Sequence, residues 1–344
     1  MEKHFTHMIP KRCEICEAKE GLLRCAGCST YYFCSRAHQR EYWPTHKSTC
    51  NTIKKAKQVA DDMEAEIRAD GYYDHVPTAA FSDDPRRRMY IRARMTHAEM
   101  LIRSWRHQGI KDALTICQAL VRLDRVDRES CRDLVPALLL RLGRDQECYD
   151  FCKWWQAVAC DDSDYNPRDA TLPFLDIKDA DATEPADLWK GEQFPRITHL
   201  GTLQLLKMRL FRGLQLAQRC RATTPGLSAA EILARIRGEY RGDILERRPE
   251  LVADDATLNE CATRVNESLA DLLHSITATN KNYLIMLVSP TEEEFQANTH
   301  RYVPGSEEEA RLAFSNTYNA WVESPGAIEQ LRKVLGIIVN AGME

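Results

Sequence analysis

The chain has 344 residues, 44% of them hydrophobic and 28% charged, a composition typical of a folded protein rather than a disordered or fibrous one. This length favours two or three domains over a single compact core. Because 47 lysines and arginines face 51 aspartates and glutamates, the formal net charge of -4 gives no general attraction to nucleic-acid phosphates.

Nothing in the sequence indicates a membrane partner. Its longest apolar run, Tyr283 to Val288, is far shorter than the roughly 20 residues that span a bilayer. The first residues also lack the apolar core of a signal peptide. We therefore expect a protein of the cytoplasm, the nucleus or both.

The cysteines are unevenly distributed along the chain. Six of the thirteen lie between Cys13 and Cys50, and the others are scattered through helix-like sequence without paired spacing. In a reducing compartment we expect the scattered cysteines to be small buried side chains rather than disulfide partners.

The first fifty residues contain eight candidate zinc ligands with the pattern C-x2-C-x8-C-x2-C-x5-C-x3-H-x7-H-x3-C. Each C-x2-C knuckle presents two thiolates to one tetrahedral Zn2+, and a structural zinc site is closed by four sulfur or nitrogen ligands. The other two pairs are each four residues apart, which places both members on one face of a helix. The ligands are Cys13, Cys16, Cys25, Cys28, Cys34, His38, His46 and Cys50.

Two structural zinc ions therefore use all eight ligands. A segment of about 40 residues cannot bury enough apolar surface to fold alone, whereas each structural zinc contributes about 10 to 16 kcal/mol in small zinc peptides. A catalytic zinc would need a position left open for water, and here every position is filled. The spacing alone leaves open whether the two ligand sets are sequential or interleaved.

The elements expected around these ligands are short. Tyr31, Tyr32 and Phe33 predict a strand that leads into Cys34. Ser35 is the expected N-cap of a first short helix, and Pro44 lies where the first turn of a second helix would begin.

The stretches Cys25 to Cys28, Tyr32 to Gln39 and Tyr42 to Cys50 resemble the MYND zinc finger. This resemblance implies interleaved pairing, with Cys13, Cys16, Cys34 and His38 on one ion and Cys25, Cys28, His46 and Cys50 on the other. The sixth ligand of the family is usually cysteine, and here it is His38, which zinc accepts equally well.

The resemblance also implies a binding surface for peptides. In peptide-binding members of the family, proline-containing ligands lie along the hairpin and contact a glutamine after the sixth ligand and a tryptophan in the following helix. Gln39 and Trp43 occupy those positions. The alternative for Trp43 is packing between the two short helices.

The charge of the finger favours a protein partner over nucleic acid. Residues 1–50 carry eight lysines or arginines and five acidic residues, a formal charge of +3, which falls to +1 with two Zn2+ and six thiolates. This charge is too small for strong phosphate binding.

The rest of the chain is predicted to be helical. A helix with Ile53, Ala60 and Ile67 on one face runs from the finger to Gly71, and turn residues in 72–85 indicate a linker. Four helices are expected in 86–159. Gly109 and Gly143 lie 34 residues apart, each between two helical stretches, and this is the tetratricopeptide period.

Further long helices are expected in 196–220 and 258–288, and two more in 307–335. The run from Val135 to Trp155 resembles a segment of fungal MYND proteins of unassigned role. The acidic segment 161–187 has a net charge of -7 and is expected to be a solvated loop or to cover helices.

We thus expect a small zinc-held α+β finger followed by an all-α domain of helical hairpins that resembles tetratricopeptide repeats. The predicted divisions are the finger (1–50), a connecting helix (51–71), a linker (72–85) and the helical domain (86–344).

We predict a protein-protein interaction adaptor, not an enzyme, whose finger recognises peptide segments of partners in a regulatory complex. One alternative is a DNA-associated transcriptional regulator, which the basic stretch from Arg86 to Arg94 would favour. A lysine methyltransferase is less compatible with the sequence, because no SET motif follows Cys50 and the remainder is helical. We do not expect direct binding of nucleic acid.

Overall fold

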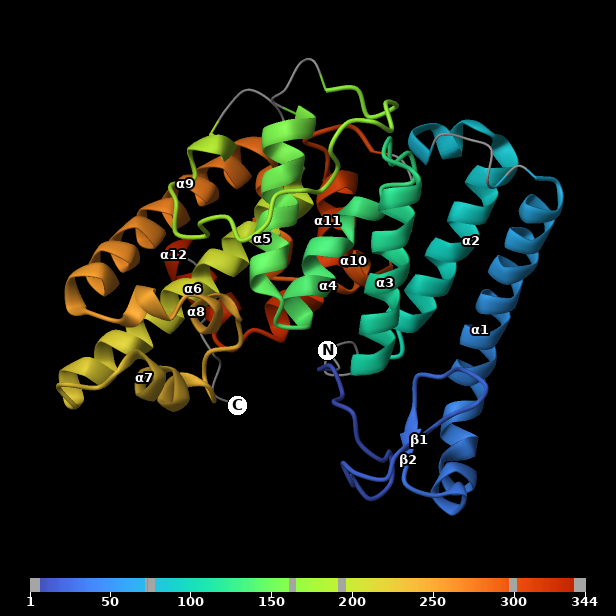
Figure 1. Ribbon diagram of the computed structural model, residues 1–344, viewed down its shortest axis with the longest axis horizontal. Coiled ribbons are helices and arrows are strands. Elements are labelled where there is room, and N and C mark those ends of the chain that lie inside the picture. Colours follow the sequence, from blue (N-terminus) through green and yellow to red (C-terminus); the bar gives the residue numbers. More distant parts are fainter. Residues whose placement is uncertain are drawn as a thin grey trace. The chain divides into compact units, whose positions relative to one another are not determined.

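The computed structural model describes residues 7–71, 73, 78–160, 165–190, 196–296 and 302–336 (Figure 1). Contacts divide the chain into two compact units. We call Thr6–Leu138 with Asp164–Phe174 the finger unit, and Leu139–Ser163 with Leu175–Glu344 the C-terminal unit. Within the described ranges, none of the helices combines the length and the apolar character that crossing a bilayer requires.

The finger unit begins with a two-stranded antiparallel sheet and continues as helices. Leu23 of the first strand pairs with Phe33 of the second, and Arg24 pairs with Tyr32. The elements are β1 (Leu23–Arg24), β2 (Tyr32–Phe33), α1 (Arg36–Ala69), η2 (Thr78–Asp83), α2 (Pro85–Ile102), α3 (His107–Leu123) and η3 (Cys131–Asp133).

Helix α1 is longer than the sequence analysis predicted. Ser35 is its N-cap, as expected, and the Ser35 hydroxyl accepts a hydrogen bond from the His38 N–H at 3.2 Å. Pro44 lies inside the helix instead of starting a second one. The prediction of two short helices and a separate connecting helix is therefore wrong: the proline lacks only one N–H, and the remaining hydrogen bonds keep the backbone helical.

Helix α1 packs against α2, and α2 packs against α3 (Figure 1). The predicted stripe is the buried one, since Ile53, Ala60 and Ile67 are all buried. On the same side, Arg94 of α2 forms ion pairs with Asp61 and Glu64 of α1. The part of α1 beyond the finger is thus held against α2.

The expected linker 72–85 falls partly outside the described residues, which omit 72 and 74–77. Its described end forms η2 and the first residue of α2. The contacts group the finger with α1, α2 and α3 and divide the chain near Leu138. The predicted domain boundaries stay a prediction. Expression of residues 86–344 alone would test whether they fold independently.

Four helices are present in the region 86–159 as expected, with α4 (Val135–Arg141) and α5 (Asp145–Trp154) following α2 and α3. Gly143 lies in the α4–α5 turn with a positive φ of 71°, a conformation that favours glycine. Gly109, however, lies in the first turn of α3. The predicted placement of Gly109 between two helices is wrong, so the 34-residue interval does not join two equivalent turns.

The C-terminal unit is also helical, and α6 and α9 pack side by side at its centre (Figure 1). Scattered cysteines such as Cys148, Cys152 and Cys261 are buried here. After α5 the elements are η4 (Trp155–Cys160), η5 (Asp187–Trp189), α6 (Ile197–Thr223), α7 (Ala229–Ile236), α8 (Ile244–Arg247), η6 (Pro249–Val252), α9 (Asp255–Val288), α10 (Glu292–Gln296), α11 (Glu307–Val322) and α12 (Ala327–Val334).

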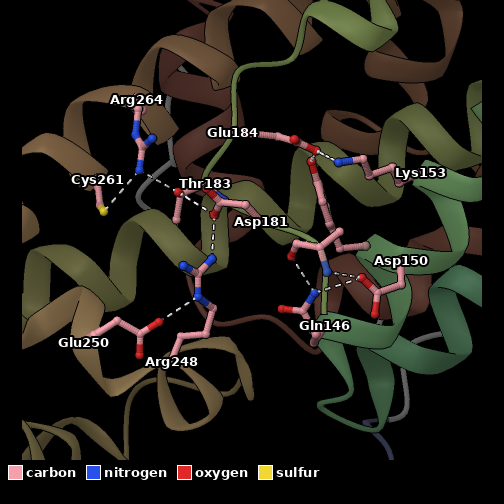
Figure 2. A network of polar contacts seen from close by, with 12 residues as sticks. Gln146, Asp150, Lys153, Asp181, Thr183, Glu184, Arg248, Glu250, Cys261 and Arg264 are labelled. Atoms are coloured by element: carbon pink, nitrogen blue, oxygen red, sulfur yellow. Dashed lines mark hydrogen bonds and ion pairs between the residues drawn. The ribbon is translucent and has the colours of Figure 1, made fainter. Parts of the chain in front are cut away.

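Part of the acidic segment covers helices of this unit. We call residues 179–184 the strap (Figure 2). The Asp150 carboxylate of α5 accepts hydrogen bonds from the backbone N–H groups of Asp179 and Ala180, both at 2.9 Å. Lys207 of α6 is fully buried and donates to the Glu184 carbonyl at 2.6 Å.

Charged side chains hold the rest of the strap. Arg248 donates to the Asp181 carboxylate at 2.7 Å, and Arg264 of α9 donates to the Thr183 hydroxyl at 2.9 Å (Figure 2). Asp181 of the strap therefore neutralises a basic residue of the same unit.

We predict that Asp150→Ala lowers the free energy of unfolding by about 1 to 3 kcal/mol, because it removes the carboxylate that accepts from two partly buried N–H groups of the strap. Asp187→Ala is the matched control, since the Asp187 side chain is 73% exposed and its carboxylate forms a surface ion pair with Lys190. The control should change stability by no more than about 0.5 kcal/mol. Chemical denaturation followed by circular dichroism measures both, and equal losses would contradict the role of Asp150.

Candidate metal centre

The eight candidate ligands lie in two groups of four. Within each group, the ligand atoms are all within 4.8 Å of one another. The first group is Cys13, Cys16, Cys34 and His38, and the second is Cys25, Cys28, His46 and Cys50. This is the interleaved arrangement that the resemblance implied.

The distances within the first group fit one tetrahedral ion. The Cys16 and Cys34 sulfurs are 3.5 Å apart, and His38 Nδ1 lies 3.4 Å from the Cys13 sulfur and 3.2 Å from that of Cys34. Ideal zinc bonds place two sulfurs about 3.8 Å apart and a sulfur and a nitrogen about 3.6 Å apart. Zinc therefore fits between these atoms with small adjustments.

The second group is the more buried one, since all four of its residues are buried. The Cys25 and Cys50 sulfurs are 3.7 Å apart, and His46 Nε2 lies 3.3 Å from Cys25 and 3.5 Å from Cys28. His46 thus presents Nε2 to its group, whereas His38 presents Nδ1. His46 lies inside α1, one turn before Cys50, so the side chains of His46 and Cys50 point toward the same metal position.

In the second group, ionisation of Cys25 is favoured and ionisation of the other two thiols is opposed. The Cys28 thiol beside Cys25 lowers the pKa of Cys25 to about 3 although burial opposes this. The same contact, together with burial, raises the pKa of Cys28. Burial and the nearby Cys25 raise the pKa of Cys50 to about 11. A divalent cation removes this conflict, because it stabilises all three thiolates at once.

Both knuckles adopt the same local turn. The Glu17 N–H donates to the Cys13 carbonyl at 3.1 Å, and the Ser29 N–H donates to the Cys25 carbonyl at 2.8 Å. Glu17 and Ser29 both have a positive φ, 59° and 56°, which closes the turn behind each pair of sulfurs. In each C-x2-C knuckle, a local hydrogen bond and a residue with positive φ therefore determine the geometry of the turn.

Gly27 lies in the second knuckle against the metal ligands. A Cβ at this position would lie 2.8 Å from the Cys50 sulfur, closer than side-chain contacts allow. Any larger residue would displace a ligand. The sequence analysis assigned no role to this glycine, although its place inside a C-x2-C knuckle was a signal.

Residues 13–50 match the family model of the MYND finger. This segment is a MYND finger. It is a zinc-binding protein-protein interaction module, and its two Cys3His groups are consistent with two zinc ions.

The same segment is similar to curated proteins. Egl nine homolog 1 of Homo sapiens is 45% identical over 38 residues, which are 11% of this chain and 9% of that protein. Egl nine homolog 1 of Mus musculus is also 45% identical over 38 residues, 10% of its length. The match thus spans about a tenth of the relatives' length. No solved structure matches the chain.

The MYND finger is docked on the start of α3. Arg106 donates to both oxygens of Glu14, at 3.0 and 2.8 Å, and its guanidinium lies 4.3 Å from the centre of the Tyr31 ring. The Tyr32 hydroxyl donates to Gln108 at 2.8 Å. Glu14 lies between the first two zinc ligands, so the docking contact reaches the metal site itself.

Backbone contacts complete this docking. The Ile9 N–H donates to the Trp105 carbonyl at 2.7 Å, and the His107 N–H donates to the Ile9 carbonyl at 2.9 Å. A Cβ at Gly109 would lie 2.5 Å from the Leu101 carbonyl and 3.1 Å from the Thr30 side chain. Gly109 therefore permits the close approach of α3 to the end of α2 and, less tightly, to Thr30 of the finger, a role that sequence reasoning missed.

The two predicted peptide-contact residues lie on α1 and face different surroundings. Trp43 is 38% exposed, and its ring meets the His46 ring edge-on at 5.8 Å between centres. Gln39 is half-buried. Because α1 is continuous, Trp43 does not pack between two short helices. Their contact with a peptide stays a prediction.

We predict that the protein purified without chelator carries two zinc ions per chain, because each group supplies four ligands. Native mass spectrometry measures this number directly. Cys25→Ser should lose one ion, whereas Cys220→Ser, which lies outside both groups, should retain two. An equal loss in both variants would contradict the assignment of Cys25 as a ligand.

We further predict that Arg106→Ala lowers the free energy of unfolding by about 3 kcal/mol, because it leaves the buried Glu14 carboxylate unpaired. Both ions should remain, since Arg106 is not a ligand. The control is Arg12→Ala, whose ion pair with Glu17 is exposed and contributes at most about 1 kcal/mol. Thermal unfolding with parallel zinc analysis tests this, and equal stability of the two variants would contradict the docking role.

Proposed function

We propose that the protein is a non-enzymatic adaptor whose MYND finger recognises peptide segments of partner proteins in a regulatory complex. The observation that carries the proposal is the exposed Trp43 on a zinc-held scaffold, beside the half-buried Gln39. An exposed tryptophan on a rigid element is the kind of side chain that dominates binding at protein interfaces.

A free strand edge supports peptide binding. β2 has β1 on one side and Cys13–Glu14 on the other, where the Glu14 N–H donates to the Tyr32 carbonyl at 3.1 Å. β1 has only β2 as a strand partner among the described residues, and Leu23 is 57% exposed. The register directs the backbone N–H and C=O of Arg24 away from β2. An added peptide strand would therefore pair with β1.

The alternative of a DNA-associated regulator finds less support. Arg86 pairs with Asp70, Arg92 with Glu129 and Arg94 with Asp61. The basic stretch is thus largely compensated by acidic residues of the same unit. A surface of this kind releases few counterions on a phosphate backbone, so we propose a protein rather than a nucleic acid as partner.

The helical body is proposed as a scaffold that carries the finger. A tetratricopeptide-like arrangement of 86–159 remains part of this proposal. The packed hairpin α2–α3 favours it, whereas the position of Gly109 inside α3 disfavours it.

We predict that Trp43→Ala weakens binding of a proline-containing peptide by about 2 kcal/mol or more, about 30-fold in Kd, and that Gln39→Ala weakens it less. An array of immobilised proline-containing peptides identifies the ligand, and fluorescence anisotropy with the best peptide measures the affinity. Zinc content is measured in each variant, so that lost binding is not confused with an unfolded finger.

The matched controls are Val59→Ala and Gln58→Ala, which change exposed residues of α1 beyond the finger. Both should bind the peptide as the unmodified protein does. Unchanged affinity in Trp43→Ala and Gln39→Ala, with two zinc ions retained, would exclude this surface and move the interaction to the helical body.

A further inference from the structure

A pocket in the C-terminal unit lies far in sequence from the finger and has no part in the proposed function. Its walls come from α6, from the α7–α8 connection and from the turn between α11 and α12. We call it the arginine pocket, because Arg209, Arg212 and Arg241 line it and Glu239 is the only acidic residue among its lining residues. The lining carries a formal charge of +2, although Arg209 is paired with the buried Asp145 behind it.

Two of these arginines have hydrogen-bond capacity to spare. Arg212 Nη1 donates to the Pro325 carbonyl at 2.7 Å, and its ion pair with Glu239 is long at 3.7 Å. Arg241 Nη1 donates to the Glu323 carbonyl at 3.3 Å. A guanidinium has five N–H donors in a planar fork, so most of the donors on both residues remain available to a ligand.

The N-terminus of α12 adds a favourable field. This helix begins at Ala327, which lines the pocket, and its N-cap Gly326 makes no side-chain cap. Gly326 has a φ of 74°, and a Cβ there would lie 3.1 Å from Arg212 Nη1. The Ala327 N–H already donates to the Ser324 carbonyl at 3.1 Å, so the glycine brings a guanidinium next to the partial positive charge of the helix N-terminus, and both attract an anion.

Two buried residues of the wall adjoin the fully buried Asp145, and Arg209 forms an ion pair with its carboxylate at 3.2 Å. Tyr240 is 6% exposed, and its hydroxyl has no hydrogen-bond partner in the part of the chain that the structure describes. Arg209 is 9% exposed, and its Nε likewise lacks a partner there. Asp145 already compensates Arg209, so the positive charge available to a ligand comes from Arg212 and Arg241.

The size of the pocket limits the ligand. Its volume of about 20 Å³ accommodates little more than one oxygen-sized group. A ring or a nucleotide base does not fit inside. A tetrahedral oxyanion places one oxygen inside and leaves the others to the arginines at the mouth.

We propose that the arginine pocket is a binding site for a phosphate group, held by Arg212, Arg241 and the N-terminus of α12. The phosphate belongs either to a small phosphorylated molecule or to a phosphorylated side chain, since the recognised group is the same. Because the ligand joins α6, the α7–α8 connection and α12, binding stabilises the C-terminal unit.

The test uses the full-length zinc-loaded protein and inorganic phosphate, with sodium chloride and acetate at the same ionic strength as reference anions. At saturating phosphate we expect Tm to rise by about 2 to 4 °C over chloride. Equilibrium dialysis with labelled phosphate gives the Kd. The double variant Arg212→Gln/Arg241→Gln should weaken phosphate binding about tenfold or more, with circular dichroism unchanged.

The control variant is Arg237→Gln, whose side chain is exposed, pairs with Glu246 and lies outside the pocket lining. It should bind phosphate normally. A phosphoserine peptide and a sugar phosphate, each compared with its unphosphorylated form, distinguish the two sources of the group. Equal stabilisation by acetate and phosphate, or binding retained in the folded double variant, would overturn the proposal, and neither result bears on the finger.

Discussion

The repulsion between thiolates is the constraint on which the finger depends. Six cysteines and two histidines converge in two groups whose ligand atoms lie within 4.8 Å of one another, and in each group ionisation of one thiol opposes that of the next. Without a metal, ionisation of all three thiols in one group is unfavourable. Zinc supplies the missing charge, so the hairpin and the start of α1 are held mainly by metal-ligand bonds and less by apolar burial.

The effect of the metal extends beyond the finger because docking is polar and specific. Glu14 is fixed between two ligands and holds Arg106, and Arg106 in turn lies over Tyr31. If the first knuckle loses its metal, the acceptor of a buried guanidinium loses its position, and an uncompensated buried charge is costly. The finger and the helices α1–α3 therefore share stability, which agrees with their grouping in one compact unit.

Features that depend on neighbouring residues could be predicted from the sequence, whereas contacts between residues far apart in the chain could not. Ligand spacing, the Ser35 cap and the stripe on α1 follow from neighbouring residues, and they could be predicted. The pairing of the ligands came only from the resemblance to a family. Glu14 and Arg106 are 92 residues apart, and no spacing rule marks an ion pair of this kind. Gly109 was misread because its role depends on the close approach of Ser104 and Leu101 at the end of the preceding helix, together with Thr30 of the finger, and not on a turn at its own position.

Docking also limits how a partner can approach the MYND finger. Tyr31 and Tyr32 are buried, and both edges of β2 are occupied. The side of the finger that faces α3 is thus unavailable, because Arg106 and its neighbours already use its polar groups. What remains for a partner is the β1 edge and the surface around Trp43. Because α1 continues from this surface without a break and packs against α2, these helices limit the directions from which a protein partner can approach the finger.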